Sequence, residues 1–482
     1  MLLSELLAID LPKFSDHLVT GLSLDSRVVQ PGDLFFAMTG TQTDGKFYID
    51  MALQQGAIAI VKQSPTFSIE ILPSNMPYIN LPNLSARLGE IAAKFYQNPS
   101  QNMSVIGVTG TNGKTSITHA IAHILQSYAP CGLFGTLGYG IYGDLQPASH
   151  TTPHAIYLQN LFADLHKQKV SQVVMEVSSH ALAQGRVNGI NFETAVLTNL
   201  SRDHLDYHKT MTAYSDAKRL LFDMPNLKNA VVNYDDELGR SILTELPTTL
   251  TYSIQDKTAN VYAKILNYNN NGCQLSIHSD WGSEKLHSPW LGHFNVSNIL
   301  AILTTLLSMD FPLNELINKL TILPTVPGRM ERLGTTGQVT AVIDYAHTPD
   351  ALEKALLALS EHLSGQIWCV FGCGGNRDRG KRQLMGEIAQ LCADKVVITD
   401  DNPRNENSQV IIDDILQGCP TPTAVISDRK QAIEYALQNA DVNDVVLIAG
   451  KGHEDYQLIG EQRLPFSDRD IVNSFYQTSL RK

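Results

Sequence analysis

The sequence predicts an α/β protein of three domains: a small α/β domain, a central domain built on a parallel sheet, and a C-terminal doubly wound domain. The chain of 482 residues is too long to fold around one ordinary hydrophobic core, and a typical length of about 150 residues per domain predicts roughly three domains. Short apolar runs alternate with helical patterns, which is typical of a parallel sheet covered by helices. The segment LPTVPGRMERL, with two prolines and a glycine, is a reasonable linker. We therefore place the domains at 1–85, 86–327 and 328–482.

The first domain is predicted from the short apolar runs GDLFFAMTG and GAIAIVKQ, which turn-forming residues separate. In the central domain the strand-like runs are SVIGV, QVVMEVS, TAVLTNL and NAVVNYD. The segment around 260–290 predicts an antiparallel hairpin, and NVSNILAILTTLLSM predicts a helix. In the third domain the strand-like runs are TAVIDY, IWCVFGC, DKVVITDD and DVVLIAG.

Composition and charge exclude several classes of protein. Lys and Arg number 36 against 48 Asp and Glu, so the formal charge of −12 argues against general nucleic-acid binding. The N-terminus lacks the basic start and cleavage site of a signal peptide, and no apolar run approaches the roughly 18 residues of a membrane span. We expect a cytoplasmic protein. The six irregularly spaced cysteines are expected as reduced core thiols.

Residues 107–115 read GVTGTNGKT, between the strand-like run SVIGV and the helical pattern SITHAIAHIL. Strand, glycine-rich turn and helix in this order predict a phosphate-binding loop, because backbone N–H groups and the helix N-terminus then point at one anion. Lys114 would reach the terminal phosphates, and Thr115 would hold Mg²⁺ through its hydroxyl. Val108 stands where the strict Walker pattern has glycine. An ordinary glycine-rich turn with an incidental lysine is the alternative.

The segment TGTNGKT resembles the phosphate loop of the Mur ligase and folylpolyglutamate synthetase superfamily. Further segments resemble that superfamily in the same order: EVSSHAL, NLSRDHLDYH, GHFNVSN, PGRMER and DYAHTPD. The resemblance implies a UDP-binding first domain, a P-loop ATPase-like central domain and a Rossmann-like third domain. It also implies ATP as co-substrate, and it assigns to ATP the residues Gly110, Thr111, Asn112, Gly113, Lys114, Thr115, Asn295, Asn298, Arg329 and Asp344.

The resemblance implies a catalytic and metal site in the central domain. Glu176 ends a strand-like run, where a carboxylate is a natural ligand for Mg²⁺. His204 resembles a family site residue, although a lone histidine is often only a structural hydrogen-bonding group. Lys218 resembles the family's carbamylated lysine, whose anionic carbamate would suit a magnesium site; composition alone favours an ordinary surface lysine. The implied catalytic residues are Lys114, Glu176, His204 and Lys218, and the implied metal ligands are Thr115, Glu176, His204 and Lys218.

Further resemblances concern the substrates. The segment LDSRVVQPGDLFFAMTGTQTDG resembles the UDP-binding segment of the family's branch that adds the third amino acid of the peptide. The residues implied to contact the UDP-muramoyl peptide are Ser26, Thr41, Gln42, Thr43, Thr151, Thr152, Ser178, Gln184 and Arg186. A cationic Arg186 suits a substrate that bears phosphates and carboxylates.

The segment DDNPRNE resembles the form of the family that takes meso-diaminopimelate. An arginine fork binds a carboxylate through two parallel hydrogen bonds, and lysine as substrate lacks the distal carboxylate that Arg404 would hold. The implied pocket consists of Arg377, Asp401, Asn402, Pro403, Arg404, Gly450 and Glu454. Arg377 could instead serve a phosphate.

Together these resemblances imply an ATP-dependent ligase that adds diaminopimelate to a UDP-linked muramoyl dipeptide through an acyl phosphate, in peptidoglycan synthesis. Its partners are then small molecules, and we expect a monomer. Two alternatives stay within the enzyme class: a lysine-adding relative, disfavoured by Arg404, and a folylpolyglutamate synthetase, which lacks the UDP-binding domain. An alternative from another class is a binding protein that uses its phosphate loop as a switch. The aligned site residues of the third domain argue against it.

Overall fold

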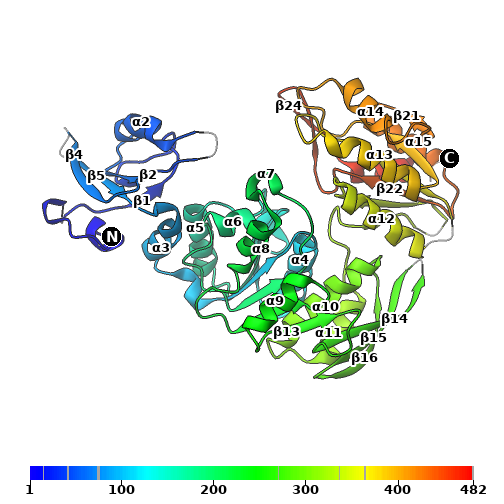
Figure 1. The fold of residues 1–482 in the computed structure, drawn as a ribbon, viewed down its shortest axis with the longest axis horizontal. Helices are drawn as coiled ribbons and strands as arrows, with labels where there is room; N and C mark the ends of the chain where they lie inside the picture. The colour runs from blue at the N-terminus through cyan, green and yellow to red at the C-terminus, as the bar shows by residue number, and fades with distance from the viewer. Residues whose placement is uncertain are drawn as a thin grey trace. The chain divides into compact units, whose positions relative to one another are not determined.

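The computed structural model describes residues 1–14, 16–40, 43–72, 76–269, 271–335, 337–362 and 365–479. The chain divides into two compact units, Met1–Thr251 and Tyr252–Lys482. Figure 1 shows the helices and strands of both units. The fold is α/β with predominantly parallel sheets, as the alternation of strand-like and helical runs predicts.

The first unit begins with a five-stranded sheet of order β1-β2-β3-β5-β4, in which β4 runs antiparallel to β5 (Figure 1). Leu34 and Phe36 of β2 belong to one hydrophobic cluster, and Phe35 and Ala37 belong to another on the opposite face. Helices therefore cover both faces, and β2 is buried throughout. The elements are α1 (Leu3–Leu7), β1 (Gly21–Ser23), β2 (Asp33–Ala37), α2 (Ile49–Gln54), β3 (Ala59–Gln63), β4 (Ser68–Leu72), β5 (Met76–Leu81) and α3 (Leu84–Phe95), with 3₁₀ turns at Pro12–Phe14, Gly45–Tyr48 and Pro99–Asn102.

The rest of the first unit is built on strands in the order β12-β11-β6-β10-β7-β8-β9. The strands β12, β11, β6, β10 and β7 are parallel, and β7, β8 and β9 form an antiparallel extension. Because Glu176 at the end of β10 pairs with Val108 of β6, its carboxylate lies at the edge where the glycine-rich loop begins. The elements are β6 (Ser104–Thr109), α4 (Lys114–Gln126), β7 (Cys131–Gly135), β8 (Gly138–Ile141), β9 (Asp144–Gln146), α5 (Ala155–Lys167), β10 (Gln172–Glu176), α6 (Ser179–Ala183), β11 (Thr194–Leu197), α7 (Leu205–His208), α8 (Met211–Arg219), β12 (Asn229–Asn233) and α9 (Glu237–Glu245).

The boundary between the units falls within β13 (Leu250–Ser253). In the second unit β14 (Val261–Asn269) and β15 (Gly272–Ser279) pair antiparallel, and β16 (Gly282–Ser288) extends them. This confirms the predicted hairpin. The predicted helix is α10 (His293–Leu307), which is buried almost all round, and α11 (Leu313–Thr321) follows it.

The C-terminal part of the second unit is a six-stranded sheet of order β17-β18-β22-β19-β20-β21, antiparallel at β17. Leu447 and Ala449 of β22 pack with α12, α13 and α14, whereas Val446 and Ile448 pack with α15 and α16 on the opposite face. The predicted doubly wound sheet is confirmed. The elements are β17 (Glu331–Leu333), β18 (Thr340–Asp344), α12 (Pro349–His362), β19 (Ile367–Phe371), α13 (Gly380–Cys392), β20 (Lys395–Ile398), α14 (Ser408–Leu416), β21 (Ala424–Val425), α15 (Arg429–Asn439), β22 (Val445–Ala449), β23 (Tyr456–Ile459), β24 (Gln462–Pro465) and α16 (Asp468–Ser479).

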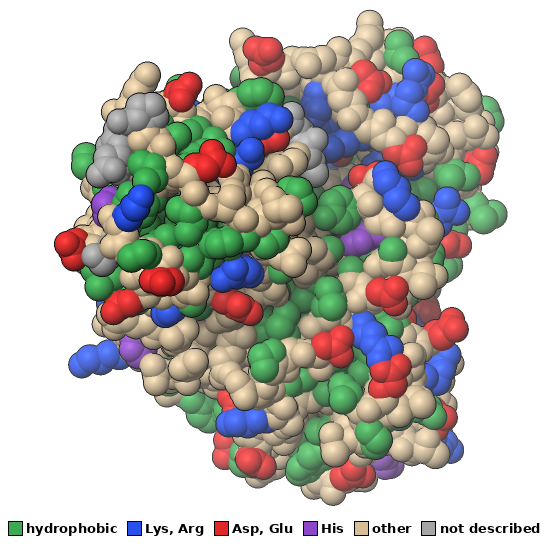
Figure 2. Space-filling model, turned by 60° about the vertical axis from the view of Figure 1, so that its left-hand side comes forward, with side chains coloured by type: hydrophobic (Ala, Val, Ile, Leu, Met, Phe, Trp, Pro, Cys, Tyr) green, Lys and Arg blue, Asp and Glu red, His purple; other side chains and the backbone are tan. Residues whose placement is uncertain are grey.

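The distribution of charged side chains and the positions of the six cysteines can be compared with the expectations from the sequence. On the face that Figure 2 shows, acidic and basic side chains are interspersed among polar and apolar ones. Within the described residues, no helix is both long enough and apolar enough to cross a membrane. The six cysteines are free thiols, and all but Cys392 are buried. Five of the six therefore lie in the core, and their reduced state stays a prediction.

Candidate functional site

The predicted phosphate loop lies between β6 and α4. Gly113 has φ +88° and directly precedes the first residue of α4. A Cβ at Gly110 would lie 1.8 Å from Thr198 Oγ1, so glycine is required by space as well as by its φ of +148°. Lys114 Nζ donates to the carbonyl oxygens of Gly110 (2.8 Å) and Thr111 (2.9 Å). The loop thus combines a helix N-terminus and an ammonium at one place, which is the chemistry that binds phosphate.

Residues after β11 hold this loop in place. Thr198 Oγ1 donates to the Asn112 carbonyl oxygen at 2.6 Å, and Asn112 N–H donates to Asn199 Oδ1 at 3.0 Å. Thr111 N–H donates to the Asn199 carbonyl oxygen at 2.8 Å. The conformation of the loop therefore depends on a neighbouring strand as well as on its own glycines.

Glu176 lies at the end of β10 and is buried, with 1% of its surface exposed. Its Oε2 accepts hydrogen bonds from Thr115 Oγ1 at 3.0 Å and from Thr136 Oγ1 at 3.2 Å, and its Oε1 accepts from Thr136 N–H at 2.7 Å. Thr136 Oγ1 also lies 3.1 Å from Thr151 Oγ1. The structure thus brings together Thr115 and Glu176, two of the predicted metal ligands, as neighbouring oxygen donors.

Lys218 is on α8 and has only 1% of its surface exposed, so the reading as a surface lysine is wrong. Its Nζ lies 4.3 Å from the centre of the Tyr214 ring. Burial lowers the pKa of Lys218 well below its usual range, and the like charge of Lys114 adds to this. Asp203 and Asp236 oppose the shift only in part. A buried lysine of low pKa supplies the neutral amine that CO₂ modification requires.

His204 belongs to a cluster of aromatic rings beside Lys218. It has φ +54°, and its ring centre lies 4.9 Å from that of His180 and 6.0 Å from that of Tyr214. Burial lowers the pKa of His180 to about 4, so this imidazole is neutral at physiological pH. His208 Nε2 is 3.0 Å from Ser179 Oγ. His204 therefore lies between this group of rings and the Asp203 carboxylate, whose Oδ2 is 3.6 Å from its Nε2.

The predicted muramoyl-peptide residues of the central domain are hydrogen-bonded to one another. Arg186 Nη1 donates to the Thr152 carbonyl oxygen at 2.9 Å, and its Nε donates to Gln184 Oε1 at 2.9 Å. Thr152 Oγ1 donates to the Glu176 carbonyl oxygen at 2.8 Å and accepts from Ser178 N–H at 3.1 Å. This network therefore connects the predicted substrate residues to the strand that bears Glu176.

The predicted UDP residues of the first domain are less fully described. Ser26 is buried, and its hydroxyl lies 3.2 Å from Met51 Sδ. Thr43 is exposed, and its carbonyl oxygen accepts from Gly40 N–H at 2.9 Å. Thr41 and Gln42 lie outside the described residues. Their proposed contacts with the nucleotide stay predictions.

Asn295 and Asn298 lie in the first turns of α10, in the second unit. Asn298 Nδ2 donates to Asn295 Oδ1 at 2.8 Å, and Asn295 Nδ2 donates to the Leu291 carbonyl oxygen at 2.8 Å. Just before this helix, Gly292 N–H donates to His362 Nε2 at 2.8 Å. The two amides therefore form one oriented pair at a fixed helix N-terminus.

Arg329 and Asp344 also lie together in the second unit. The Arg329 guanidinium is 4.5 Å from the centre of the Tyr345 ring. Asp344 accepts from Met330 N–H at 2.7 Å and from Ala346 N–H at 2.8 Å. Burial raises the pKa of Asp344, and Arg329 together with these N–H donors opposes the increase. Asp344 is thus positioned by the backbone on both sides of it.

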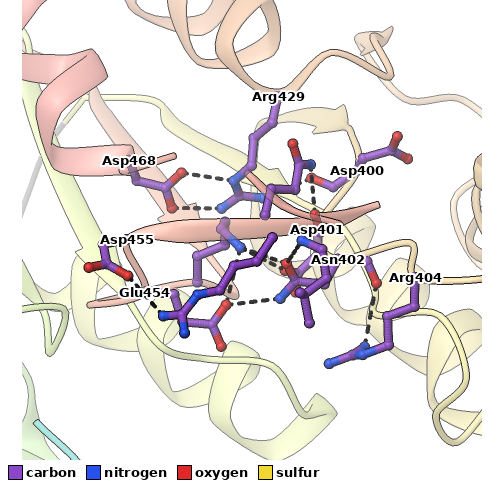
Figure 3. Close-up of polar contacts among 12 residues, drawn as sticks. Asp400, Asp401, Asn402, Arg404, Arg429, Glu454, Asp455 and Asp468 are labelled. Carbon is purple, nitrogen blue, oxygen red and sulfur yellow. Dashed lines mark hydrogen bonds and ion pairs between the residues drawn. The ribbon is translucent and has the colours of Figure 1, made fainter. Parts of the chain in front are cut away.

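The predicted amino-acid pocket is formed by residues that follow β20 and β22. Asn402 Nδ2 donates to Glu454 Oε2 at 2.9 Å (Figure 3). Lys451 Nζ donates to Asn402 Oδ1 at 3.0 Å and to Glu454 Oε2 at 3.1 Å, and lies 3.6 Å from Asp401 Oδ1. Gly450, with φ +114°, lies close to Asp401, because a Cβ there would be 3.2 Å from Asp401 Oδ2.

Arg404 adopts φ +51°, and its Nη1 donates to the Gly375 carbonyl oxygen at 2.9 Å (Figure 3). Its backbone is held by β23, since Arg404 N–H donates to the Leu458 carbonyl oxygen at 3.0 Å. Pro403, just before it, is buried. Arg377 is exposed on the neighbouring loop, and the Arg377 Cγ would lie 3.6 Å from a Cβ at Gly374. Two guanidinium groups and the Glu454 carboxylate thus come from one edge of the sheet.

Sequence reasoning missed two residues that organise these sites. Thr136 directly follows β7. Lys451 comes after β22, next to the predicted Gly450 and three residues before the predicted Glu454. A polar residue at the carboxyl end of a parallel strand is the signal that could have found both. Among the described residues no group of three or more His, Cys, Asp and Glu side chains could hold a metal ion, so any metal here depends on other donors.

Comparison with known proteins gives the family. Three family models match: "Mur ligase family, catalytic domain" at residues 18–96, "Mur ligase middle domain" at 108–306, and "Mur ligase, glutamate ligase domain" at 328–452. A UDP-N-acetylmuramoyl-L-alanyl-D-glutamate--2,6-diaminopimelate ligase of Coxiella burnetii is 48% identical over 94% of this chain and 95% of its own length.

A ligase of the same name from Pseudomonas syringae pv. tomato is 47% identical over 94% of each chain. A solved structure of a ligase of this name is 39% identical, covers 99% of each chain and has a TM-score of 0.75. The match extends over all the segments that carry the site residues described above. The chain belongs to the Mur ligase family of amide-bond-forming enzymes.

Proposed function

We propose that the chain joins meso-2,6-diaminopimelate to UDP-N-acetylmuramoyl-L-alanyl-D-glutamate, with conversion of ATP to ADP and phosphate, in peptidoglycan precursor synthesis. The observation that carries the proposal is the pocket after β20 and β22, where Arg404 and Glu454 lie at one sheet edge. The distal end of diaminopimelate bears a carboxylate and an ammonium. A guanidinium and a carboxylate are complementary to these two charges. The names of relatives up to 48% identical support the same substrates.

The residues assigned to the nucleotide are considered within each unit separately. Lys114 and the N-terminus of α4 would bind the phosphates, because both are positively polarised and meet at one loop. Asn295 and Asn298 would serve the adenine through the oriented amide pair. Arg329 and Asp344 would complete the contacts to ATP, and their positions are fixed by Tyr345 and by backbone N–H groups.

The donors in the first unit fit Mg²⁺. Thr115 and Glu176 present neighbouring hard oxygen atoms, which magnesium prefers. The described residues hold no cluster of three His, Cys, Asp or Glu side chains that could bind a metal ion. Phosphate oxygens and a modified Lys218 would therefore supply the further oxygen ligands. His204, whose ring lies 6.0 Å from that of Tyr214, is the remaining proposed ligand. When bound, Mg²⁺ would neutralise charge on the transferred phosphoryl group.

Lys218 is proposed to carry a carbamate. The neutral amine adds to CO₂, forming one N–C bond and releasing one proton, and the product bears a carboxylate in place of an ammonium. The low pKa that burial gives Lys218 favours this reaction, because only the uncharged amine is a nucleophile. The change also removes the repulsion between the ammonium of Lys114 and that of the buried Lys218.

The chemistry that follows is the formation and consumption of an acyl phosphate. The γ-carboxylate of the D-glutamyl residue attacks the γ-phosphorus of ATP, the bond from that phosphorus to the β,γ-bridging oxygen breaks, and ADP leaves; Lys114 neutralises the charge that develops on the phosphoryl oxygens. The uncharged amine of diaminopimelate then attacks the acyl carbon, phosphate leaves with the bridging oxygen, and the nitrogen releases one proton as the amide forms. Arg186, Gln184 and Thr152 would orient the muramoyl peptide through their shared network. Holding the reactants in register supplies much of the rate increase.

We further propose that the enzyme acts as a monomer in the cytoplasm, where the small-molecule substrates are present. The test of function is release of phosphate from ATP by the purified chain, with each substrate omitted in turn. Release is expected only when the UDP-dipeptide and meso-diaminopimelate are both present, and the product should gain the mass of one diaminopimelate residue. Release with ATP alone would contradict the proposal and would favour a nucleotide switch.

A further inference from the structure

Lys451 is a fully buried cation next to the amino-acid pocket, with 0% of its surface exposed. It follows Gly450 at the carboxyl end of β22 and precedes the turn that bears Glu454. The rings of Tyr456 and Phe466 lie 5.5 Å and 6.0 Å from its Nζ. An ammonium in such a place is costly to bury unless carboxylates and hydrogen-bond acceptors surround it.

The partners of this ammonium are residues assigned to the pocket. Asn402 Oδ1 accepts from both Lys451 Nζ (3.0 Å) and Leu458 N–H (2.9 Å). Because two donors engage this oxygen, the amide orientation is fixed, and Nδ2 points to Glu454 Oε2 at 2.9 Å. Lys451 therefore fixes the orientation of the Asn402 amide together with the Leu458 N–H group.

Lys451 also fixes one oxygen of Glu454. Glu454 Oε2 accepts from Lys451 Nζ at 3.1 Å as well as from Asn402 Nδ2, so Oε1 takes no part in these two bonds and can accept from a ligand. Asp401 Oδ1 lies 3.6 Å from the same Nζ. One buried cation thus balances two carboxylates that would otherwise repel each other across the pocket.

We propose that Lys451 is a positioning residue for the incoming amino acid: it holds Asn402 and Glu454 in the arrangement that receives the distal ammonium, while Arg404 takes the distal carboxylate. This inference rests on the proposed function, since it assumes that an amino acid with a distal ammonium and carboxylate occupies this pocket. Lys451 acts through its neighbours and does not touch the reacting atoms.

The hydrogen-bond partners of Lys451 differ from those of the other buried cation of the region, Arg429, which supports a local role for Lys451. Arg429, which is also buried, pairs with Asp468 at 2.8 Å (Figure 3). It also donates to the carbonyl oxygens of Ala449 and Asp400. That ion pair fixes the backbone on which the pocket is built. Lys451, in contrast, bonds to the side chains of Asn402 and Glu454 themselves, so its loss changes the pocket directly.

The test is a comparison of steady-state constants for the whole chain and for Lys451→Met, which keeps most of the stem and removes the charge. The KM for meso-diaminopimelate is expected to rise by at least about tenfold, because a buried acceptor and a carboxylate lose their donor. The KM values for ATP and for the UDP-dipeptide, and kcat at saturating diaminopimelate, should change by less than about threefold, because the polar partners of the Lys451 ammonium, Asn402, Glu454 and Asp401, are all assigned to diaminopimelate. Lys451→Gln retains an N–H donor, so its KM for diaminopimelate should lie between that of the unmodified chain and that of Lys451→Met.

The matched control is Asp444→Ala, at the opposite end of β22. Asp444 is buried and accepts from Gln366 N–H at 2.9 Å and Trp368 Nε1 at 3.3 Å. Its loss should lower the melting temperature without changing the KM for diaminopimelate. A merely structural role for Lys451 would produce this same pattern.

Each outcome decides the matter. An unchanged KM for diaminopimelate in folded Lys451→Met, or an equal rise in all three KM values, would overturn the inference. Loss of a cooperative melting transition in both Lys451 variants would assign this lysine to folding alone and would also contradict it. If the unmodified chain does not use diaminopimelate at all, the proposed function itself fails, and the two failures are thereby distinguished.

Discussion

Two buried lysines show how differently one side chain is used in the two units. Lys218, 1% exposed, lies over the Tyr214 ring and forms no ion pair with a carboxylate among the described residues. Lys451, 0% exposed, lies 3.1 Å from the carboxylate of Glu454 and 3.6 Å from that of Asp401. Burial is nearly the same at both positions, but among the described residues only Lys451 has carboxylates within ion-pair distance of its ammonium.

The comparison shows that the groups around a buried lysine decide whether its side chain is suited to reaction or to orienting its neighbours. Without a close carboxylate, desolvation and the nearby Lys114 lower the pKa of Lys218, so it is an amine available for reaction. Lys451 lies beside two carboxylates, and its hydrogen bonds orient the side chains of Asn402 and Glu454. The first region is therefore suited to chemistry and the second to recognition, and the following predictions test that division.

The largest effect is expected from Lys218→Ala, which should lower kcat by about a thousandfold, because a charged ligand in the reacting region is lost. A short carboxylate added to the buffer should restore part of the activity. The measurement is phosphate release with and without acetate. Lys167→Ala, an exposed lysine of α5, is the control and should keep full activity. Full activity of Lys218→Ala would contradict the proposed role of Lys218 in the reaction.

The next effect concerns recognition. Arg404→Met should reduce kcat/KM for meso-diaminopimelate by about a hundredfold, because the distal carboxylate would be buried without its guanidinium partner. The kcat/KM for lysine, which lacks that carboxylate, should hardly change. The selectivity between the two amino acids is measured side by side on both proteins. Equal losses for both would show that Arg404 holds the pocket together and does not choose its ligand.

A smaller effect separates the nucleotide residues of the second unit from its amino-acid pocket. Asn298→Ala removes one amide of the pair that meets at 2.8 Å, and the KM for ATP should rise by about tenfold. The KM for diaminopimelate should stay constant. A rise confined to the amino acid would contradict the assignment of this pair to adenine.

The smallest effect is on stability, from a histidine outside both regions. His362 Nε2 accepts a hydrogen bond from Gly292 N–H, and its Nδ1 lies 2.9 Å from the Asn269 carbonyl oxygen. The imidazole must be neutral to accept at Nε2, and burial lowers the pKa of His362 from its ordinary value. The contribution of His362 to the free energy of unfolding is therefore fully present above the pKa of the unfolded state and is lost as the pH falls below that pKa. Between about pH 7 and 5, His362→Gln should reduce the slope of the free energy of unfolding by up to about 1.4 kcal/mol per pH unit. An unchanged slope in denaturant titrations would contradict this.

Much of the fold could be predicted because its signals are local. The runs SVIGV and DVVLIAG became β6 and β22, and the glycines of TGTNGKT lie between a strand and a helix as expected. The antiparallel extension through β8 and β9 was not predicted, since its short strands carry little periodicity.

The site was predicted less completely, because its organisation depends on contacts between distant segments. The residues implied by resemblance include Glu176 and Asn402, but nothing in the sequence shows that Thr136 holds the first or that Lys451 holds the second. The burial of Lys218 could not be read from α8, whose pattern also suits a surface helix. Only the fold brings these groups together.

The most direct test of the central claim, that one buried lysine is modified and the other is a fixed cation, is a carbon NMR spectrum of the protein in ¹³C-labelled bicarbonate. The account predicts one carbamate signal in the unaltered chain, its loss in Lys218→Met, and its persistence in Lys451→Met. A spectrum without that signal, or a signal that disappears with Lys451 and not with Lys218, would contradict the account.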